Sequence, residues 1–432
     1  MTGRWGGLTR GAAALVLLVA NGGCGGADRA PGPGWSAASG GGPSSSGGTA
    51  SSAGASSGGG VPGSGGSSAG SGTGGAGAAA TGGAAGADQA PFPNPDWAVG
   101  SALDHGLDPQ ALDAAAQVAQ EKGSYCFLVI RHGVVVAEHY WNGHEQTTPE
   151  RSWSIAKSYS STLVGIAIDR GDLGSLDDKV ADYIPEWKGT EHEVVTIRDV
   201  LRMSSGLDWS AFQDYVGMAT FAQDHSKFAL GLKQAKPPGQ EWVYNNAGVQ
   251  VLEPLFRNAT GMTIEQYAEK YLWSKLGMKA SWAHDPSGNP TAYASVLASC
   301  RDHARLGYLY LQGGRWGTQQ VVPAGWVKTA LTPSQPMNRA YGLLWWLNAE
   351  TPAVDAMMKP WPGRMVPFAP TDHFAARGFG NQFVDVFPSL DLLVVRFGPD
   401  PLATFDLAAL TTDQRFETHD AILKPVLDAI TD

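Results

Sequence analysis

The sequence contains few cysteines and no group of residues with the spacing of a metal site. Its 432 residues include three cysteines, and no two of them have zinc-site spacing. Two His-Glu pairs begin an H-E-x-x-H motif, but both lack the second histidine. The net charge is −10, and no run of lysine and arginine forms the basic stripe that binds phosphate groups. We therefore expect no metal, no cofactor and no nucleic-acid partner.

Long hydrophobic runs are also absent, and the apolar run near the N-terminus is predicted to be part of an export signal. Two arginines precede this run at residues 12–20, which is shorter than the about 20 residues of a membrane-spanning helix. Small residues and Cys24 follow directly. This order resembles the lipobox of bacterial lipoproteins, whose cysteine is acylated, although Asn21 stands where a lipobox usually has leucine. We expect a signal peptide over 1–23 and lipid attachment at Cys24; plain secretion is the alternative.

Residues 24–90 form a Gly/Ser/Ala-rich segment that lacks the apolar residues of a core. Residues 21–90 hold 26 of the 57 glycines and only three charged residues. Such a segment cannot offset the entropy cost of ordering, so we expect a disordered tether that holds an anchored enzyme away from a membrane. Two G-x-S-x-G sequences, around Ser56 and Ser68, lie inside it. The nucleophile elbow that this motif marks needs a strand and a helix, so we discount both.

Residues 91–432 have the composition of a globular domain, with strand-like runs at both ends and helix-like runs between them. This order predicts an α+β fold, in which an antiparallel sheet assembled from the two chain ends is flanked by helices. A mostly helical subdomain is expected over about 155–310. The predicted strands are 125–130, 134–140, 382–387 and 392–397, and the main predicted helices are 109–121, 154–169, 197–203, 248–259, 264–276, 300–311 and 415–430.

Cys126 and Cys300 are the two cysteines beyond the tether. Cys126 lies in a strand-like apolar run and Cys300 opens a helix-like segment, and both positions suit small buried residues. We therefore expect two unpaired cysteines. A disulfide between them, which export to an oxidising compartment permits, is the alternative.

Ser154 and Lys157 have the spacing of a nucleophile and its base. Three residues apart on a predicted helix, they lie on one face, so the amine can take the proton of the hydroxyl. Burial and the helix N-terminus favour the neutral amine and direct backbone amides to the place where an oxyanion would form. Of the 13 lysines, only Lys157 has a serine three positions before it.

Two Tyr-x-Asn sequences flank this pair. The first, which begins at Tyr140, lies at a hairpin end and is interpreted as strand-end packing. The second, Tyr244-Asn245-Asn246, lies in a loop between a Pro-Pro-Gly turn and an apolar helix. We predict that the Tyr244 phenol relays a proton to a leaving group and that Asn246 orients a substrate or Lys157.

Five short motifs resemble, in order, those of the penicillin-recognising serine hydrolases. They are Ser154-Ile155-Ala156-Lys157, Met203-Ser204-Ser205-Gly206-Leu207, Pro238-Gly239 with Tyr244-Asn245-Asn246, Leu276-Gly277-Met278 and Arg301-Asp302-His303-Ala304-Arg305. This superfamily includes class C β-lactamases, D-Ala-D-Ala carboxypeptidases, family VIII carboxylesterases and 6-aminohexanoate-dimer hydrolase. The resemblance spans about 100–432 and implies a helix-flanked antiparallel sheet with an inserted helical domain. It also implies Ser154 as nucleophile, Lys157 as general base and Tyr244 as acid/base, with Asn246 beside them.

The sequence departs from the family at the Lys-Thr-Gly motif of the strand beside the site. The best candidate is Ala376-Arg377-Gly378, in which alanine replaces the lysine. Gly378 is predicted to let the strand approach the substrate, and the Phe379 amide to pair with that of Ser154 as an oxyanion hole. Arg377 either substitutes for the missing cation or is a solvated strand-end residue. The missing lysine argues against efficient β-lactamase or carboxypeptidase activity.

The sequence looks closest to the esterase and amide-hydrolase branch, in segments such as 127–130, 271–276 and 380–382. We therefore predict a serine hydrolase that cleaves a small-molecule carboxylic ester or amide through an acyl-enzyme. One alternative is a peptidoglycan D,D-carboxypeptidase or class C-like β-lactamase, and another is a catalytically inactive cell-surface binding module. The apolar insertion between Trp346 and His373 is interpreted either as a wall of an apolar cleft or as a packed excursion.

Overall fold

The computed structural model describes residues 91–399 and 414–432, which belong to one unit extending from Gln89 to Asp432. The predicted signal peptide, Cys24, the tether and both G-x-S-x-G sequences lie outside the described residues. Within the described ranges, no helix is both long enough and apolar enough to cross a membrane.

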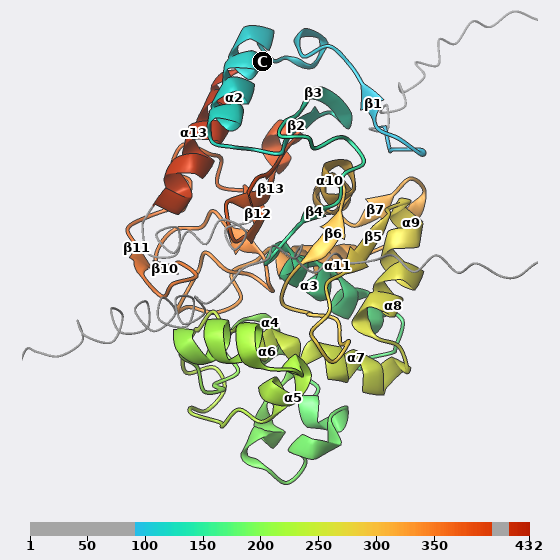
Figure 1. Ribbon diagram of the computed structural model, residues 1–432, viewed down its shortest axis with the longest axis vertical. Helices are drawn as coiled ribbons and strands as arrows, with labels where there is room; N and C mark the ends of the chain where they lie inside the picture. Colours follow the sequence, from blue (N-terminus) through green and yellow to red (C-terminus); the bar gives the residue numbers. More distant parts are fainter. Residues whose placement is uncertain (1–90, 400–413) are drawn as a thin grey trace, which may run out of the picture. The chain divides into compact units, whose positions relative to one another are not determined.

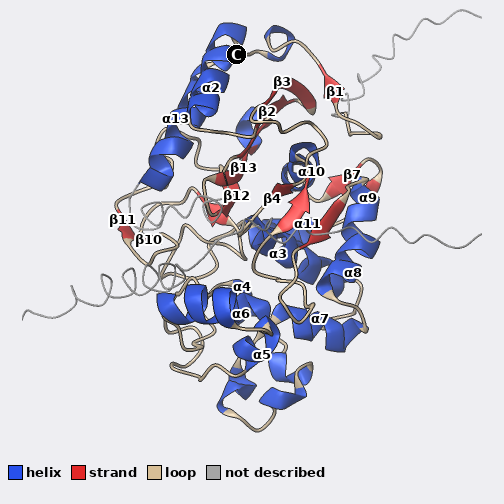
Figure 2. Ribbon diagram, viewed as in Figure 1, coloured by secondary structure: helices blue, strands red, loops and turns tan. Residues whose placement is uncertain are grey.

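A seven-stranded sheet built from both ends of the described chain lies at the centre of the fold (Figures 1 and 2). Its order is β1-β3-β2-β14-β13-β12-β9, and the two chain ends meet where β2 pairs antiparallel with β14. All neighbours are antiparallel except β1 and β3. The strands are β1 (Ala98–Val99), β2 (Cys126–Arg131), β3 (Val134–Tyr140), β9 (Trp346–Leu347), β12 (Phe374–Gly378), β13 (Gln382–Phe387) and β14 (Leu392–Phe397). The predicted sheet of an α+β fold is confirmed.

Helices cover both faces of this sheet. The four that do so are α2 (Pro109–Glu121), α3 (Ile155–Asp169), α10 (Cys300–Leu311) and α13 (Gln414–Asp428). α2 and α13 lie side by side, as Figure 1 shows, whereas α3 and α10 pack on the strands themselves. Successive side chains of β13 point to opposite faces of the sheet: Val384 faces Gly307 of α10, and Asp385 contacts His419 of α13. Every residue of β2, β13 and β14 is buried for this reason.

The chain between α3 and α10 forms a mostly helical region, and α4 to α8 occupy the lower part of Figure 1. α3 and α10, at the limits of the expected 155–310 subdomain, pack on the sheet and so belong to its helical layer. The helix predicted at 264–276 is divided by a π-helical turn. The elements are α4 (Ile197–Leu201), η5 (Phe212–Phe221), α5 (His225–Leu230), α6 (Asn246–Gln250), α7 (Leu252–Thr260), α8 (Ile264–Ala268), η6 (Glu269–Trp273) and α9 (Ser274–Leu276), with the short helices η2 (Val180–Asp182), η3 (Pro185–Trp187) and η4 (Glu191–Val194).

A three-stranded sheet that the sequence did not predict lies next to the start of α3. Its order is β4-β6-β5, with β4 (Glu150–Arg151), β5 (Ala280–Trp282) and β6 (Val296–Ala298). Strands this short show no readable periodicity. The remaining short elements are η1 (Leu103–His105), β7 (Arg315–Trp316), β8 (Gln319–Gln320), α11 (Ala324–Ala330), β10 (Ala353–Val354), β11 (Pro360–Trp361) and η7 (Pro388–Leu390).

The insertion between β9 and β12 is folded around one asparagine. Asn348 Nδ2 donates hydrogen bonds to Val366 O at 2.9 Å and Pro370 O at 3.0 Å, and Val366 N donates to Asn348 Oδ1 at 2.9 Å. Met365 is buried here, while Phe368 is 36% exposed. These contacts favour the packed excursion over the cleft wall, because the asparagine holds the segment against its own backbone.

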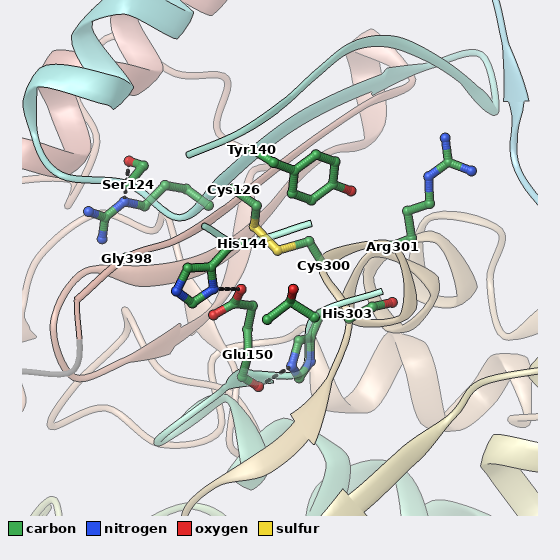
Figure 3. Close-up of a disulfide and its surroundings, with 12 residues drawn as sticks. Ser124, Cys126, Tyr140, His144, Glu150, Cys300, Arg301, His303 and Gly398 are labelled. Carbon is green, nitrogen blue, oxygen red and sulfur yellow. Dashed lines mark hydrogen bonds and ion pairs between the residues drawn. A yellow bond between two sulfur atoms is a disulfide. The ribbon is translucent and has the colours of Figure 1, made fainter. Parts of the chain in front are cut away.

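A disulfide joins Cys126 to Cys300, so the expectation of two unpaired cysteines is wrong (Figure 3). Cys126 begins β2 and Cys300 begins α10, and this helix packs on this strand, which brings the two Cα atoms to 6.6 Å. The bond closes a loop of 174 residues. His303, further along α10, contacts Glu150 O of β4 at 3.2 Å through Nε2, so the same helix also meets the strand that leads to Ser154.

Candidate active site

Ser154 follows a backbone turn that two hydrogen-bonded segments hold in place. Trp153 has a φ of 50°, a conformation that residues other than glycine seldom adopt. Ser152 N donates to Val296 O at 2.9 Å, and Ser295 N donates to Trp153 O at 2.9 Å. The chain beside β6 therefore fixes the residues on both sides of the turn. Ser154 comes directly after it and precedes the first residue of α3.

Lys157 lies on the first turn of α3 with its amine buried against three acceptors. Its Nζ is 2.9 Å from Ser154 Oγ, 2.6 Å from Asn246 Oδ1 and 2.9 Å from Tyr293 O. Burial lowers the pKa of Lys157 to about 7, while the charge of Asp214 opposes this shift. A substantial share of the amine is therefore neutral near pH 7, and its lone pair can accept the Ser154 proton.

Tyr244 is buried beside the Ser154 and Lys157 side chains. The Lys157 Nζ lies 4.7 Å from the centre of the Tyr244 ring, and the ring stacks on Trp346 at 5.8 Å. Burial raises the pKa of Tyr244 above its ordinary value, and a hydrogen bond with Ser154 opposes that rise. The phenol therefore keeps its proton at neutral pH and is placed to donate it.

The two asparagines after Tyr244 have different tasks. Asn245 caps α6, because its Oδ1 accepts from Gly248 N at 2.8 Å. Asn246 Oδ1 accepts from Lys157 Nζ, and its Nδ2 donates to Asp214 Oδ2 at 2.8 Å. The structure therefore brings Asn246 to Lys157, which is one of the two positions that the sequence predicted for its amide.

Asp214 is a buried carboxylate that sequence reasoning did not single out. It lies on η5 and is 2% exposed. Besides Asn246 Nδ2, it accepts from Asn246 N at 3.1 Å, Ala247 N at 3.0 Å and Trp209 Nε1 at 3.1 Å. No local pattern marks it, because these donors come from another helix and from the residues before η5. The one signal that the sequence offers is that Asp214 is the single charged residue of the ten-residue segment Phe212–Phe221.

The strand β12 approaches the turn before Ser154 through Gly378. A Cβ atom on Gly378 would lie 2.2 Å from Ser152 O, so the close approach requires glycine. The next ring, Phe379, meets Trp153 edge to face at 5.6 Å. Within the described chain, the backbone amides of Ser154 and Phe379 donate to no acceptor. The contact that Gly378 makes is with protein backbone, and its part in positioning a substrate stays a prediction, as does the oxyanion hole.

Comparison with known proteins identifies the family. The family model described as Beta-lactamase matches residues 111–397. The chain belongs to the beta-lactamase family. The resemblance to the penicillin-recognising serine hydrolases of the β-lactamase superfamily is therefore confirmed.

Proteins similar to this β-lactamase family member include a 6-aminohexanoate-dimer hydrolase and a class C β-lactamase. The 6-aminohexanoate-dimer hydrolase of Paenarthrobacter ureafaciens is 29% identical over 233 residues, which is 50% of this chain and 59% of that enzyme, less than two thirds of its length. A putative 6-aminohexanoate-dimer hydrolase from Bacillus anthracis has a TM-score of 0.59 at 19% identity and covers 72% of this chain and 80% of that one. A class C β-lactamase from Rhodobacter sphaeroides has a TM-score of 0.52 at 18% identity, covering 75% and 100%. Both structures share the fold.

At the position of the family's Lys-Thr-Gly motif, this β-lactamase family member buries its arginine. The Arg377 side chain is 14% exposed, and its Nη2 lies 3.7 Å from Asp385 Oδ1 and 3.3 Å from His419 Nε2. Alternation along β12 places Arg377 on the face that α13 covers, so the interpretation as a solvated strand-end residue is wrong. Ala376, at the lysine position, is fully buried.

The first Tyr-x-Asn sequence takes no part in this cluster. Tyr140 Oη donates to Glu138 Oε1 at 2.5 Å, and Asn142 Nδ2 donates to Ser124 O at 3.1 Å. These contacts agree with the interpretation as strand-end packing.

Proposed function

We propose that this chain hydrolyses a carboxylic ester or amide through a covalent acyl-enzyme on Ser154. The observation that carries the proposal is the 2.9 Å contact between Lys157 Nζ and Ser154 Oγ at a buried site where the pKa of the lysine falls to about 7. A serine needs such a partner, because its hydroxyl is a weak nucleophile at its free pKa.

The reaction follows from the positions of three side chains. Neutral Lys157 takes the Ser154 proton as Oγ attacks the carbonyl carbon, and the amides of Ser154 and Phe379 stabilise the oxyanion. Tyr244 donates its proton to the leaving oxygen or nitrogen, the bond from that atom to carbon breaks, and the phenol regains a proton from Lys157. Water then attacks the acyl carbon, gives a proton to Lys157, and releases the acid as the proton returns to Ser154 Oγ.

The test is loss of turnover and of covalent labelling. Ser154→Ala is expected to abolish hydrolysis of p-nitrophenyl esters and labelling by a serine-directed phosphonate, with the thermal unfolding temperature unchanged. Ser161→Ala, a buried serine on the same helix near Tyr310, is the matched control and should keep both activities. Labelling that persists in Ser154→Ala refutes the assignment.

We propose esters or amides over β-lactams because Ala376 leaves the usual carboxylate-binding lysine position without a cation. The second candidate, a D,D-carboxypeptidase or β-lactamase, gains support if the chain hydrolyses nitrocefin or forms a stable adduct with a fluorescent penicillin. The absence of labelling by any serine probe favours a catalytically inactive binding module instead. A panel of p-nitrophenyl esters, nitrocefin and short amide oligomers separates the three.

We further propose that the enzyme is exported, lipid-anchored at Cys24 and displayed on the periplasmic or cell-surface side by the tether. The disulfide between Cys126 and Cys300 supports export, because disulfides persist in oxidising compartments. Metabolic labelling with a fatty-acid probe should mark the full chain and not Cys24→Ser. Equal labelling of the two chains contradicts anchoring at this residue.

A further inference from the structure

We propose that Asp214 is a positioning residue of this reaction, which holds the Asn246 amide so that its oxygen faces the Lys157 amine. The inference rests on the proposed function, since it concerns the base of the same Ser154 and Lys157 pair. Asp214 touches neither Ser154 nor the place of the reacting carbonyl; it acts through Asn246.

The hydrogen bonds define the orientation of that amide. Asn246 has Lys157 Nζ 2.6 Å from Oδ1 on one side and Asp214 Oδ2 2.8 Å from Nδ2 on the other. A rotation that exchanged the two amide atoms would set NH₂ against the lysine N–H groups and oxygen against a carboxylate. Both contacts would then be repulsive. Asp214 and Lys157 therefore select one orientation together, and without the carboxylate only the lysine constrains it.

The carboxylate itself is held rigidly. Four N–H groups converge on its two oxygens: two from the Asn246 residue, one from Ala247 and one from the Trp209 ring. Two of these are the backbone amides of Asn246 and Ala247, the first residues of α6, so Asp214 fixes the backbone that carries Asn246 as well as its side chain. A group held this closely can position a neighbour with little loss of entropy on binding a substrate.

Burial raises the pKa of Asp214, and its N–H donors and the charge of Lys157 oppose this rise; the ionised carboxylate supplies the negative charge that acts on the Lys157 amine. The other titratable groups that face this amine are Tyr244 and Tyr293, whose rings lie 4.7 and 5.7 Å from Nζ and whose pKa values burial raises, so both are neutral. His225 contacts the Tyr293 hydroxyl at 3.2 Å, and burial lowers its pKa. Asp285 lies near Tyr293 and His225. Without the Asp214 charge, burial lowers the pKa of Lys157 further.

Two effects should therefore appear together in Asp214→Asn. The acidic limb of kcat/KM against pH should move to lower pH by about one unit, because the lysine then loses its proton more easily. At the same time kcat should fall at least about tenfold, since the amide no longer presents its oxygen to the base. A residue with only a structural role would lower activity without moving the limb.

The experiment measures pH profiles with p-nitrophenyl butyrate on the full chain. Asp208→Asn is the matched control, because Asp208 lies six positions earlier, contacts Gln213 and makes no contact with Asn246; its profile should overlay that of the unmodified chain. Asn246→Ala and the double variant that also carries Asp214→Asn test whether Asp214 acts through Asn246. If it does, the loss of kcat in the double variant should be smaller than the product of the two single losses.

Three results overturn the proposal: an unmoved acidic limb in folded Asp214→Asn, a limb that moves with kcat unchanged, or additive losses in the double variant. If Asp214→Asn proves too unstable to assay, Asp214→Glu decides, since it keeps the charge and displaces the carboxylate. A fall in kcat that disappears when Asn246 is already alanine then supports the proposal, whereas an unchanged kcat or an additive fall overturns it. Failure of the proposed function is separate, because Ser154→Ala would then retain phosphonate labelling.

Discussion

Removal of the Cys126–Cys300 disulfide should lower the free energy of unfolding by several kcal/mol. The bond closes a loop of 174 residues, for which the loop-closure entropy of the unfolded chain gives about 5 kcal/mol. This value is an upper limit for the loss of stability. An unfolded chain that retains structure gains less conformational entropy when the disulfide is removed. Against a total stability of about 5–15 kcal/mol for a typical protein, the loss is large.

The assay is equilibrium unfolding in urea of the chain carrying Cys126→Ala and Cys300→Ala. Both sites are buried, so alanine avoids leaving polar thiols in the core. The midpoint should fall by an amount that corresponds to about 2–5 kcal/mol, and dithiothreitol should lower the stability of the unmodified chain alone. A change below 1 kcal/mol, or an equal effect of dithiothreitol on both chains, would refute the loop-closure reasoning.

Further changes test the site and the core. The kcat/KM of the unmodified chain should fall below pH 7 as Lys157, with a pKa of about 7, becomes protonated; a flat profile from pH 5 to 8 contradicts this. Gly378→Ala should lower the free energy of unfolding in urea by about 1–3 kcal/mol and should lower kcat, because the alanine Cβ would lie 2.2 Å from Ser152 O. Asp385→Ala should lower the free energy of unfolding by about 3–5 kcal/mol by calorimetry, since it removes the buried carboxylate that His373, Arg377 and His419 contact. The pKa of Asp385 is lowered in the folded chain, so its contribution is complete above the pKa of an unfolded carboxyl group and is lost as pH falls. Aryl and medium-chain esters should be turned over faster than acetate esters, because the ring of Trp153, next to Ser154 in the chain, packs edge to face with that of Phe379 and offers apolar surface; a panel in which acetate is fastest contradicts this.

The sequence predicted those parts of the fold that have a continuous local signal. The strands at 382–387 and 392–397 match β13 and β14 because both faces are covered, and the helix at 109–121 matches α2 because Asp108 and Pro109 mark its start. The sheet β4-β6-β5 escaped prediction, since two or three residues carry no periodicity. The disulfide depends on the packing of α10 on β2, which no local pattern records.

The residues of the candidate site also differ in whether a local sequence signal predicted them. Ser154 and Lys157 could be predicted from the sequence, because residues three positions apart on a helix are neighbours in space. Tyr244 and Asn246 come to them from a distant loop, which the Tyr-x-Asn sequence, its position after a turn and the family motif together indicated. Asp214 belongs to no motif and joins the site through tertiary contacts alone.

The two sides of the candidate site come from different parts of the fold. One side determines the backbone geometry near Ser154, and the other determines the surroundings of Lys157. Gly378, the last residue of β12 in the main sheet, sets how closely this strand approaches the backbone before Ser154. In the proposed mechanism Asp214 and Asn246, from the helical region, set the orientation and the pKa of Lys157. Substitutions in η5 can therefore change the pH range of activity without changing the geometry of Ser154, because no hydrogen bond of Asp214 reaches the β12 side within the described chain.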